Sequence, residues 1–405
     1  MLTFTYTARD ASSGQKVKAE VQAESEQAAA RLIQKTGLSP LEIKVKSGDM
    51  GGPLKFLKKV RSKDKVIFSR QLSTLINAGL PLVQSLRSVM GQTKSKQLQV
   101  IISGVIADVE AGKTMNESLA KYPTVFNKVY ISLIAAGETS GTLDLALERL
   151  ANQQEKDAEL IAKVRGAMIY PAIVMLVMGA VVGFMLVSVL PQVENLYDGL
   201  SGVQLPLLTR VLLSLSHFII KRWYLVVVIL AVLAFATTKW ARTFGGKQVI
   251  DKLKMRLWPI GPLFMKLYMA RFARTGTTLV SSGVPLLQVL AIIGNAVDNV
   301  HIKKSLDAAI EKVKGGKSLS SSLQNDPNFL ELVPQMLKIG EDSGAIEKML
   351  EKTADYYEKE VDNQVKSIST IIEPVLMILL GVVALIIVAA VMLPIYGLVG
   401  KNIIK

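Results

Sequence analysis

Three long apolar runs dominate the pattern of this chain. Charged residues are absent from residues 166–193, 223–238 and 374–400. About 20 apolar residues in a helix are enough to cross the hydrocarbon core of a bilayer. The second run is short, so we expect it to include Phe218, Ile219 and Ile220. The pattern predicts transmembrane helices at 166–193, 218–239 and 371–396.

Polar segments with helical periodicity precede the first and third runs. Residues 63–165 and 240–370 are each predicted to form a bundle of helices. Gly79 followed by Pro81 is typical of one helix ending and the next beginning. Gly283 with Pro285 gives the same signal in the second segment.

The second half of the chain repeats the first. Phe68-Ser69-Arg70 corresponds to Phe272-Ala273-Arg274, and Gly137-Glu138 corresponds to Gly340-Glu341. Pro171 corresponds to Pro374; each lies near the start of an apolar run, where proline is expected to kink a helix. The repeat predicts two equivalent units, each a bundle that ends in a span. A helix unbroken from Thr142 to Leu190 would be about 70 Å long and could carry a rotation into the membrane.

The remaining segments are short. Residues 1–46 predict a small ββαβ module. Residues 47–62 form a basic linker, which is either an interfacial helix or the solvated start of the next bundle. Residues 194–217 are expected to be an outside loop and residues 397–405 an outside tail. The predicted fold is a mainly α membrane protein with two homologous cytoplasmic helical bundles, three transmembrane helices and the N-terminal module.

Charge distribution then suggests the topology. The formal net charge is +15, but only Arg210, Lys221 and Arg222 carry positive charge between the first two apolar runs. Basic loops mark the cytoplasmic side of a membrane. We therefore expect a cytoplasmic N-terminus, an outside C-terminus and contact with anionic lipid. Basic residues are not interleaved with aromatics as in nucleic-acid-binding proteins, so no nucleic acid is expected. The chain has no cysteine, which excludes disulfides and thiolate metal sites.

No catalytic, cofactor or metal site is predicted. Gly112-Lys113-Thr114 and Gly316-Lys317-Ser318 resemble the end of a phosphate-binding loop, but the glycine required five residues earlier is missing. The only histidines, His217 and His301, are not near one another in the sequence. The apolar runs lack the internal charges of ion-coupled transporters, which leaves a transporter as a distant alternative.

Two sets of residues are candidate partner contacts. The first set is the paired turn formed by Gly137, Glu138, Gly141, Gly340, Glu341 and Gly344. Gly137 is expected to end the helix that precedes it. The acids of this set either satisfy backbone amides at a helix end or contact a partner. The second set consists of the acids of the two polar stalks, Glu155, Asp157, Glu159, Glu358, Glu360 and Asp362. These acids form either a solvated face or a docking surface for a basic partner.

The repeated motifs resemble a known family. Phe68-Ser69-Arg70-Gln71-Leu72, Ala78-Gly79-Leu80-Pro81-Leu82 and Gly137-Glu138-Thr139-Ser140-Gly141, with their second copies, are similar to the platform proteins of type IV pilus machines and type II secretion systems. The resemblance covers nearly the whole chain, including the N-terminal module.

The resemblance implies a non-enzymatic scaffold in the bacterial inner membrane. Such a platform would couple a cytoplasmic hexameric motor ATPase to the insertion or removal of pilin subunits. It would also bind other inner-membrane assembly proteins and form a homo-oligomer, commonly a dimer. A type II secretion platform that handles pseudopilins is the alternative.

Overall fold

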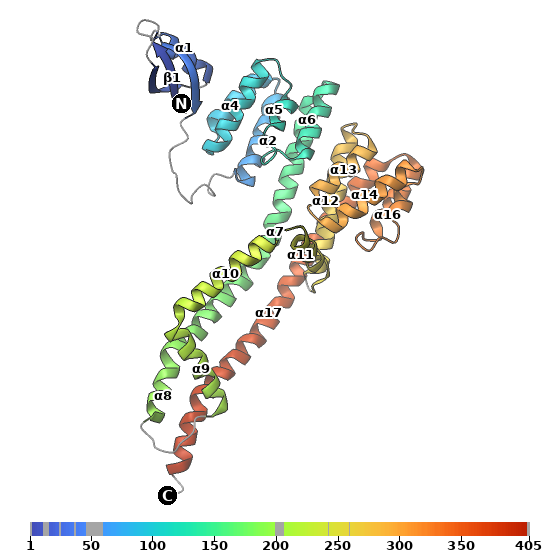
Figure 1. Cartoon of the computed structure of the whole chain (residues 1–405). Coiled ribbons are helices and arrows are strands. Elements are labelled where there is room, and N and C mark those ends of the chain that lie inside the picture. Colours follow the sequence, from blue (N-terminus) through green and yellow to red (C-terminus); the bar gives the residue numbers. More distant parts are fainter. Residues whose placement is uncertain are drawn as a thin grey trace. The chain divides into compact units, whose positions relative to one another are not determined.

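The computed structural model describes residues 2–10, 16–23, 26–35, 38–45, 60–198, 206–241, 243–258 and 260–402 (Figure 1). Most of the predicted basic linker and the end of the predicted tail lie outside these ranges. The chain divides into two compact units. The first comprises Met1–Phe126 and Gly137–Ala151, and the second comprises Asn127–Ala136 and Asn152–Lys405.

The N-terminal module is a small sheet with one helix. Strands β1 (Leu2–Asp10), β2 (Lys16–Ala23) and β3 (Leu38–Val45) form an antiparallel sheet in the order β2-β1-β3, and α1 (Glu26–Lys35) precedes β3. Tyr6, Ala8 and Ile33 are buried together. Alternation along β1 places Tyr6 and Ala8 on one face, against the apolar side of α1. The predicted ββαβ order is confirmed.

Six helices follow in the first repeat. They are α2 (Ser62–Asn77), α3 (Leu82–Gln92), α4 (Lys96–Glu110), α5 (Met115–Ala120), α6 (Lys128–Ser140) and α7 (Leu143–Phe184). Ser95 caps α4 by accepting from the Leu98 N–H, and Thr114 caps α5 by accepting from the Glu117 N–H. In the core, the rings of Phe68 and Phe126 lie 6.0 Å apart.

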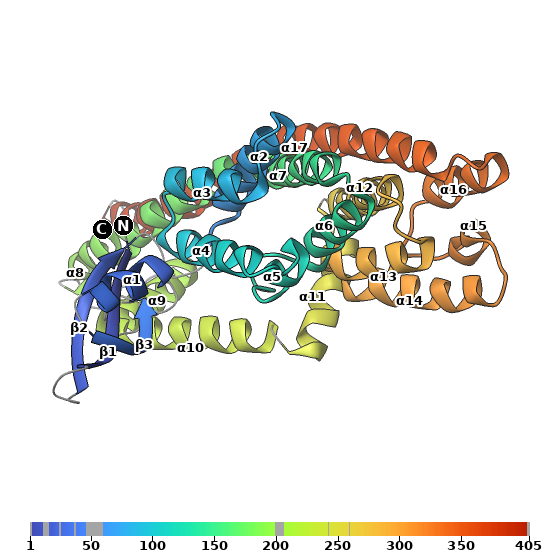
Figure 2. The same cartoon turned by 90° about the horizontal axis from the view of Figure 1, so that it is seen from above.

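The second repeat has the same order of elements. After α11 (Phe244–Arg256) come α12 (Gly261–Ser281), α13 (Leu286–Ala296), α14 (Val300–Lys314), α15 (Leu319–Leu323), α16 (Leu332–Ser343) and α17 (Ile346–Asn402). Helices α13 and α14 lie side by side (Figure 2). Phe272 and Phe329 form an edge-to-face pair at 5.3 Å, at the positions equivalent to Phe68 and Phe126.

Both repeats use glycine and proline in the same way between their first two helices. Gly79 has φ +84° and Gly283 has φ +77°, a left-handed conformation that glycine adopts without a steric penalty. The carbonyls of Pro81 and Pro285 accept the first hydrogen bonds of α3 and α13. Proline suits this place because its missing N–H would have no helical partner there.

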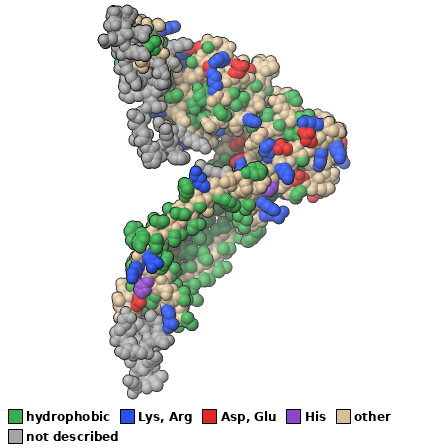
Figure 3. All heavy atoms as spheres, viewed as in Figure 1, with side chains coloured by type: hydrophobic (Ala, Val, Ile, Leu, Met, Phe, Trp, Pro, Cys, Tyr) green, Lys and Arg blue, Asp and Glu red, His purple; other side chains and the backbone are tan. Residues whose placement is uncertain are grey.

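Among the described residues, three helices are long and apolar enough to cross a membrane, within Leu143–Asn195, Trp223–Ala241 and Ile346–Pro394. Hydrophobic side chains gather along these helices (Figure 3). Leu176 is 72% exposed and Ile378 is 69% exposed, as expected for side chains that face lipid rather than a protein core. Helix α7 passes Gly166 and Pro171 without a break and is followed by a π-helical turn at Met185–Val189.

The segment predicted as an outside loop, 194–217, contains helical structure. Helix α8 (Leu190–Asp198) and helix α9 (Leu207–Lys221) occupy most of it. Helix α9 buries Leu213 against Met185 and Leu186, and the Ser216 hydroxyl donates to the Leu186 carbonyl in the π-helical turn. A π turn leaves carbonyls without their usual helical partner, and Ser216 supplies one.

The second span also begins later than expected. Phe218, Ile219 and Ile220 belong to α9, and α10 (Trp223–Ala241) starts after Arg222. Arg222 has φ −126° and ψ 31°, which ends α9. At its other end α10 continues through Lys239, whose ammonium lies 5.6 Å from the centre of the Phe235 ring. A lysine near a helix end can extend its charge toward water. Helix α10 can therefore include Lys239 and reach Ala241, so the span is long enough without residues 218–220.

Candidate functional site

The glycines of the paired turn have two different roles. Helices α6 and α16 end at Ser140 and Ser343, and the following Gly141 and Gly344 have φ +71° and +69°. The expectation that Gly137 ends its helix was wrong, because α6 continues through it. A Cβ on Gly137 would lie 2.5 Å from the Cβ of Ala146. The next helix passes so close that only glycine fits.

Replacing Gly137 by alanine should destabilise the protein by about 1 to 3 kcal/mol, the usual cost of inserting an atom into a packed contact. Thermal unfolding of the purified full-length protein in detergent would measure the loss. Gly91→Ala is the matched control, because nothing lies within 4 Å of its Cβ position. An equal response to the two substitutions would contradict the close approach.

Glu138 and Glu341 bind backbone amides of neighbouring helices. The Glu138 carboxylate accepts from the N–H groups of Met115 at 2.5 Å and Asn116 at 3.0 Å, at the start of α5. The Glu341 carboxylate accepts from Leu319 at 2.5 Å and Ser320 at 3.1 Å, at the start of α15. The first N–H groups of a helix lack helical partners and favour negative charge.

This geometry supports the structural interpretation of both acids. Each carboxylate accepts hydrogen bonds from the first N–H groups of a short helix. The side-chain hydroxyl of Thr114 or Ser318 caps the N-terminus of the same helix. The sequences that resemble a phosphate-binding loop are therefore turns that lead into these caps. A contact between either acid and a partner remains a prediction.

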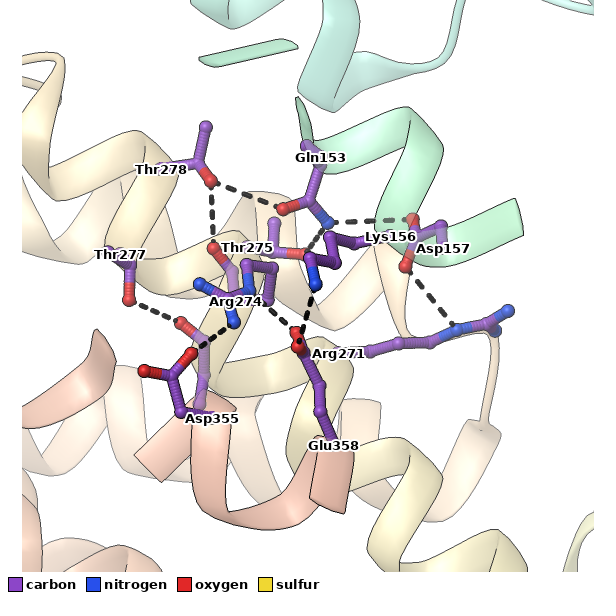
Figure 4. A network of polar contacts seen from close by, with 11 residues as sticks. Gln153, Lys156, Asp157, Arg271, Arg274, Thr275, Thr277, Thr278, Asp355 and Glu358 are labelled. Carbon is purple, nitrogen blue, oxygen red and sulfur yellow. Dashed lines mark hydrogen bonds and ion pairs between the residues drawn. The ribbon is translucent and has the colours of Figure 1, made fainter. Parts of the chain in front are cut away.

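The acids of the stalk lie among basic side chains of the second unit (Figure 4). The Arg274 Nε donates to Glu358 at 2.7 Å, and its terminal nitrogen donates to Asp355 at 2.6 Å. Lys156 of α7 reaches the same Glu358 at 3.9 Å. Because the side chain of Glu358 is only 13% exposed, it is not part of a solvated face.

Polar contacts also join α7 directly to α12. The Gln153 amide nitrogen donates to the Thr275 hydroxyl at 3.3 Å, and its oxygen accepts from the Thr278 hydroxyl at 3.2 Å. All three side chains are buried. Asp157 lies 3.9 Å from the Arg271 Nε. Buried polar groups of this kind fix the register of the two helices, since a shift would leave them unsatisfied.

Lysines pair with three more of the stalk acids, Glu159, Asp362 and Glu360. Lys163 of α7 lies 2.8 Å from Asp362 of α17 and 2.9 Å from Glu159 on its own helix. Lys266 of α12 donates to Glu360 at 2.8 Å and to Gln364 at 2.9 Å. Lys163, Glu159 and Asp362 line a cleft of about 310 Å³ between α7 and α17.

These pairings shift the ionisation of the groups involved. The hydrogen bond from Lys163 lowers the pKa of Glu159, and the hydrogen bond from Lys266 lowers the pKa of Glu360. Burial by itself would lower the pKa of Arg274, but hydrogen bonds to Glu358 and Asp355 outweigh burial and raise it. The charged forms are therefore the stable ones at neutral pH.

Lys266→Met should destabilise the full-length protein by about 1 kcal/mol at pH 7. Because the folded pKa of Glu360 is lowered, its contribution is present above its ordinary pKa of 4.5 and is lost as the pH falls through the lowered value. The difference in unfolding temperature between wild type and variant should therefore shrink below pH 4.5. A difference that stays constant with pH would exclude the ion pair as its cause.

Sequence reasoning found the stalk acids but missed their partners. Lys266 and Arg274 of α12 lie 94 and 84 residues before Glu360 and Glu358, while Arg271 of the same helix lies far after its partner Asp157. The only available signal was the repeat, in which Arg274 corresponds to Arg70.

Known proteins are similar to this chain over nearly its whole length. The family described as "Type II secretion system (T2SS), protein F" matches residues 68–191 and again residues 272–394, and its N-terminal domain matches residues 1–44. The Type IV pilus assembly protein PilC of Thermus thermophilus is 40% identical over 405 residues, which cover 99% of each chain. PilC of Myxococcus xanthus is 34% identical over 391 residues, 96% of this chain and 93% of that protein.

A relative from the secretion branch is similar to a comparable extent. The Type II secretion system protein F of Pseudomonas aeruginosa is 34% identical over 403 residues, 98% of this chain and 99% of that protein. The two family matches fall on the two bundle-and-span repeats, and the N-terminal match falls on the small sheet. This chain therefore belongs to the type II secretion system protein F family.

Proposed function

We propose that the protein is the inner-membrane platform of a type IV pilus assembly machine. The observation that carries this proposal is the 40% identity to a Type IV pilus assembly protein PilC across the full length of both chains. The duplicated bundle that continues into an apolar helix suits a scaffold that links a soluble motor to the membrane.

The platform would couple a cytoplasmic hexameric motor ATPase to the insertion or removal of pilin subunits. It would act as a homo-oligomer, commonly a dimer, together with other inner-membrane assembly proteins. Its role would be mechanical and not enzymatic. The polar contacts that join α7 to α12 and α17 support this role, because they hold helices of both repeats in one register.

The proposed topology places both bundles and the N-terminus in the cytoplasm and the C-terminus outside. Basic residues directly before the first and third spans, such as Lys163, Arg165 and Lys366, support this topology, because basic residues mark the cytoplasmic side of a membrane. Reporter fusions after Lys46, after Asp198 and at Lys405 would test it. The first should report cytoplasm and the other two the outside.

Crosslinked pull-down from membranes of the source cells tests the function. A motor ATPase and a filament-forming pilin should copurify with the full-length protein. Copurification of pseudopilins and secretion-system proteins instead would support the alternative, a type II secretion platform, to which the 34% identity over 403 residues also points. Recovery of neither set would contradict both.

A further inference from the structure

A second cleft lies where the polar segments of α7 and α17 end and their apolar segments begin. It has a volume of about 410 Å³ and is lined by residues of α7, including Gly166 and Tyr170, and by Ser369, Thr370 and Glu373 of α17. The apolar runs of both helices begin at this level. The cleft is therefore at the boundary between water and the hydrocarbon core, on the side of the bundles.

Glu373 is the unusual residue in this cleft. It is the only charged residue between Lys366 and Lys401. Its side chain is exposed, and within the described part of the chain it has no hydrogen bond or ion pair. An ionisable group at the edge of the hydrocarbon core is costly unless a partner compensates it.

The repeat places a different group opposite this acid. Tyr170 is the residue equivalent to Glu373, since each precedes the matched prolines Pro171 and Pro374. Both equivalent residues line the same cleft. A carboxylate, an aromatic ring and the hydroxyls of Ser369 and Thr370 together suit a cationic group, which can pair with the acid and lie against the ring.

The surroundings limit what can reach the cleft. Ile169 is 54% exposed and Val375 is 55% exposed, so the apolar flanks of the cleft face the bilayer. Membrane helices carry Lys and Arg at their cytoplasmic ends. A partner's membrane helix that lies against these flanks would therefore bring a positive charge to the level of Glu373.

We propose that this cleft binds the Lys or Arg flank of a membrane-spanning helix from a partner protein, with Glu373 as the pairing acid. The proposal rests on the proposed function only in naming that partner as the filament subunit. Charge complementarity selects this occupant over an apolar helix end. Gly166 leaves room for it, because a Cβ there would meet nothing within 4 Å.

The absence of native cysteine makes a direct test possible. Thr370→Cys would be combined with a single cysteine in the cytoplasmic flank of the subunit's membrane helix, and the pair oxidised in intact membranes. Glu373→Gln should lower the disulfide yield about fivefold, the effect of losing one ion pair. Glu351→Gln, which neutralises an exposed acid elsewhere on α17, should leave the yield unchanged.

Charge exchange gives the sharper result. Glu373→Lys should nearly abolish the crosslink, and exchanging the subunit's Lys or Arg for Glu should restore it in that background. Equal yields in Glu373→Gln and Glu351→Gln would overturn the proposal. So would a Glu373-dependent disulfide between two copies of this chain, which would make a second copy the occupant. If the subunit copurifies with wild type while Glu373 has no effect, this inference fails and the proposed function stands.

Discussion

Glu341→Ala should destabilise the full-length protein by about 2 to 3 kcal/mol. The substitution removes the carboxylate that accepts from the N–H groups of Leu319 and Ser320, and both of those residues are buried. Hydrogen bonds to a charged group contribute more than neutral ones, and a buried donor left unpaired has a full desolvation cost. Thermal or denaturant unfolding of the purified protein in detergent would measure the change.

The adjacent acid provides the control for this prediction. Asp342 is exposed and lacks a hydrogen bond or ion pair within the described part of the chain, so Asp342→Ala should change stability little. Glu341→Gln should fall between the two, since its amide retains one acceptor oxygen. If Glu341→Ala leaves stability unchanged but removes a copurifying partner, the carboxylate acts as a contact and not as a cap.

Arg274→Met should destabilise the protein by about 2 kcal/mol. Glu358 and Asp355 would both lose their closest positive charge. Removing one partner from a fully buried ion pair costs roughly 3 to 5 kcal/mol, and the 51% exposure of the Asp355 side chain reduces that cost here. The measurement is again unfolding of the full-length protein, with the exposed Lys352→Met on α17 as a charge-matched control.

A double variant separates lost pairing from lost packing. Arg274→Met combined with Glu358→Met removes both charges, and the uncompensated carboxylate with them. Its stability should exceed that of Arg274→Met alone. A double variant as unstable as the sum of the two single variants would show that the charges do not interact.

The roles of the paired turn could be predicted from the sequence only in part. The sequence predicted that Gly137, Glu138 and Gly141 act together, because the same spacing recurs at Gly340, Glu341 and Gly344. It assigned the end of the helix to the wrong glycine. A left-handed residue and a glycine required by close contact look identical in a sequence, and only the position of Ala146 separates them.

Properties that depend on local composition were determined by the sequence itself. The three spans, the N-terminal ββαβ order and the duplication follow from apolar run length, alternation and repeated spacing, which require no knowledge of distant contacts. The amphipathic α9 was the exception, because its buried face is defined by Leu186 and Ala390 of other helices.

Only the tertiary structure decided what the charged residues do. The stalk acids have the same appearance in the sequence whether they face water, a partner or the protein itself. Packing of α12 against α17 brought Arg274 to Glu358 and Lys266 to Glu360, while Glu373 was left in a cleft without a partner in the described chain. Coulomb energy depends on distance and burial, and neither quantity is encoded in the spacing of charges along the chain.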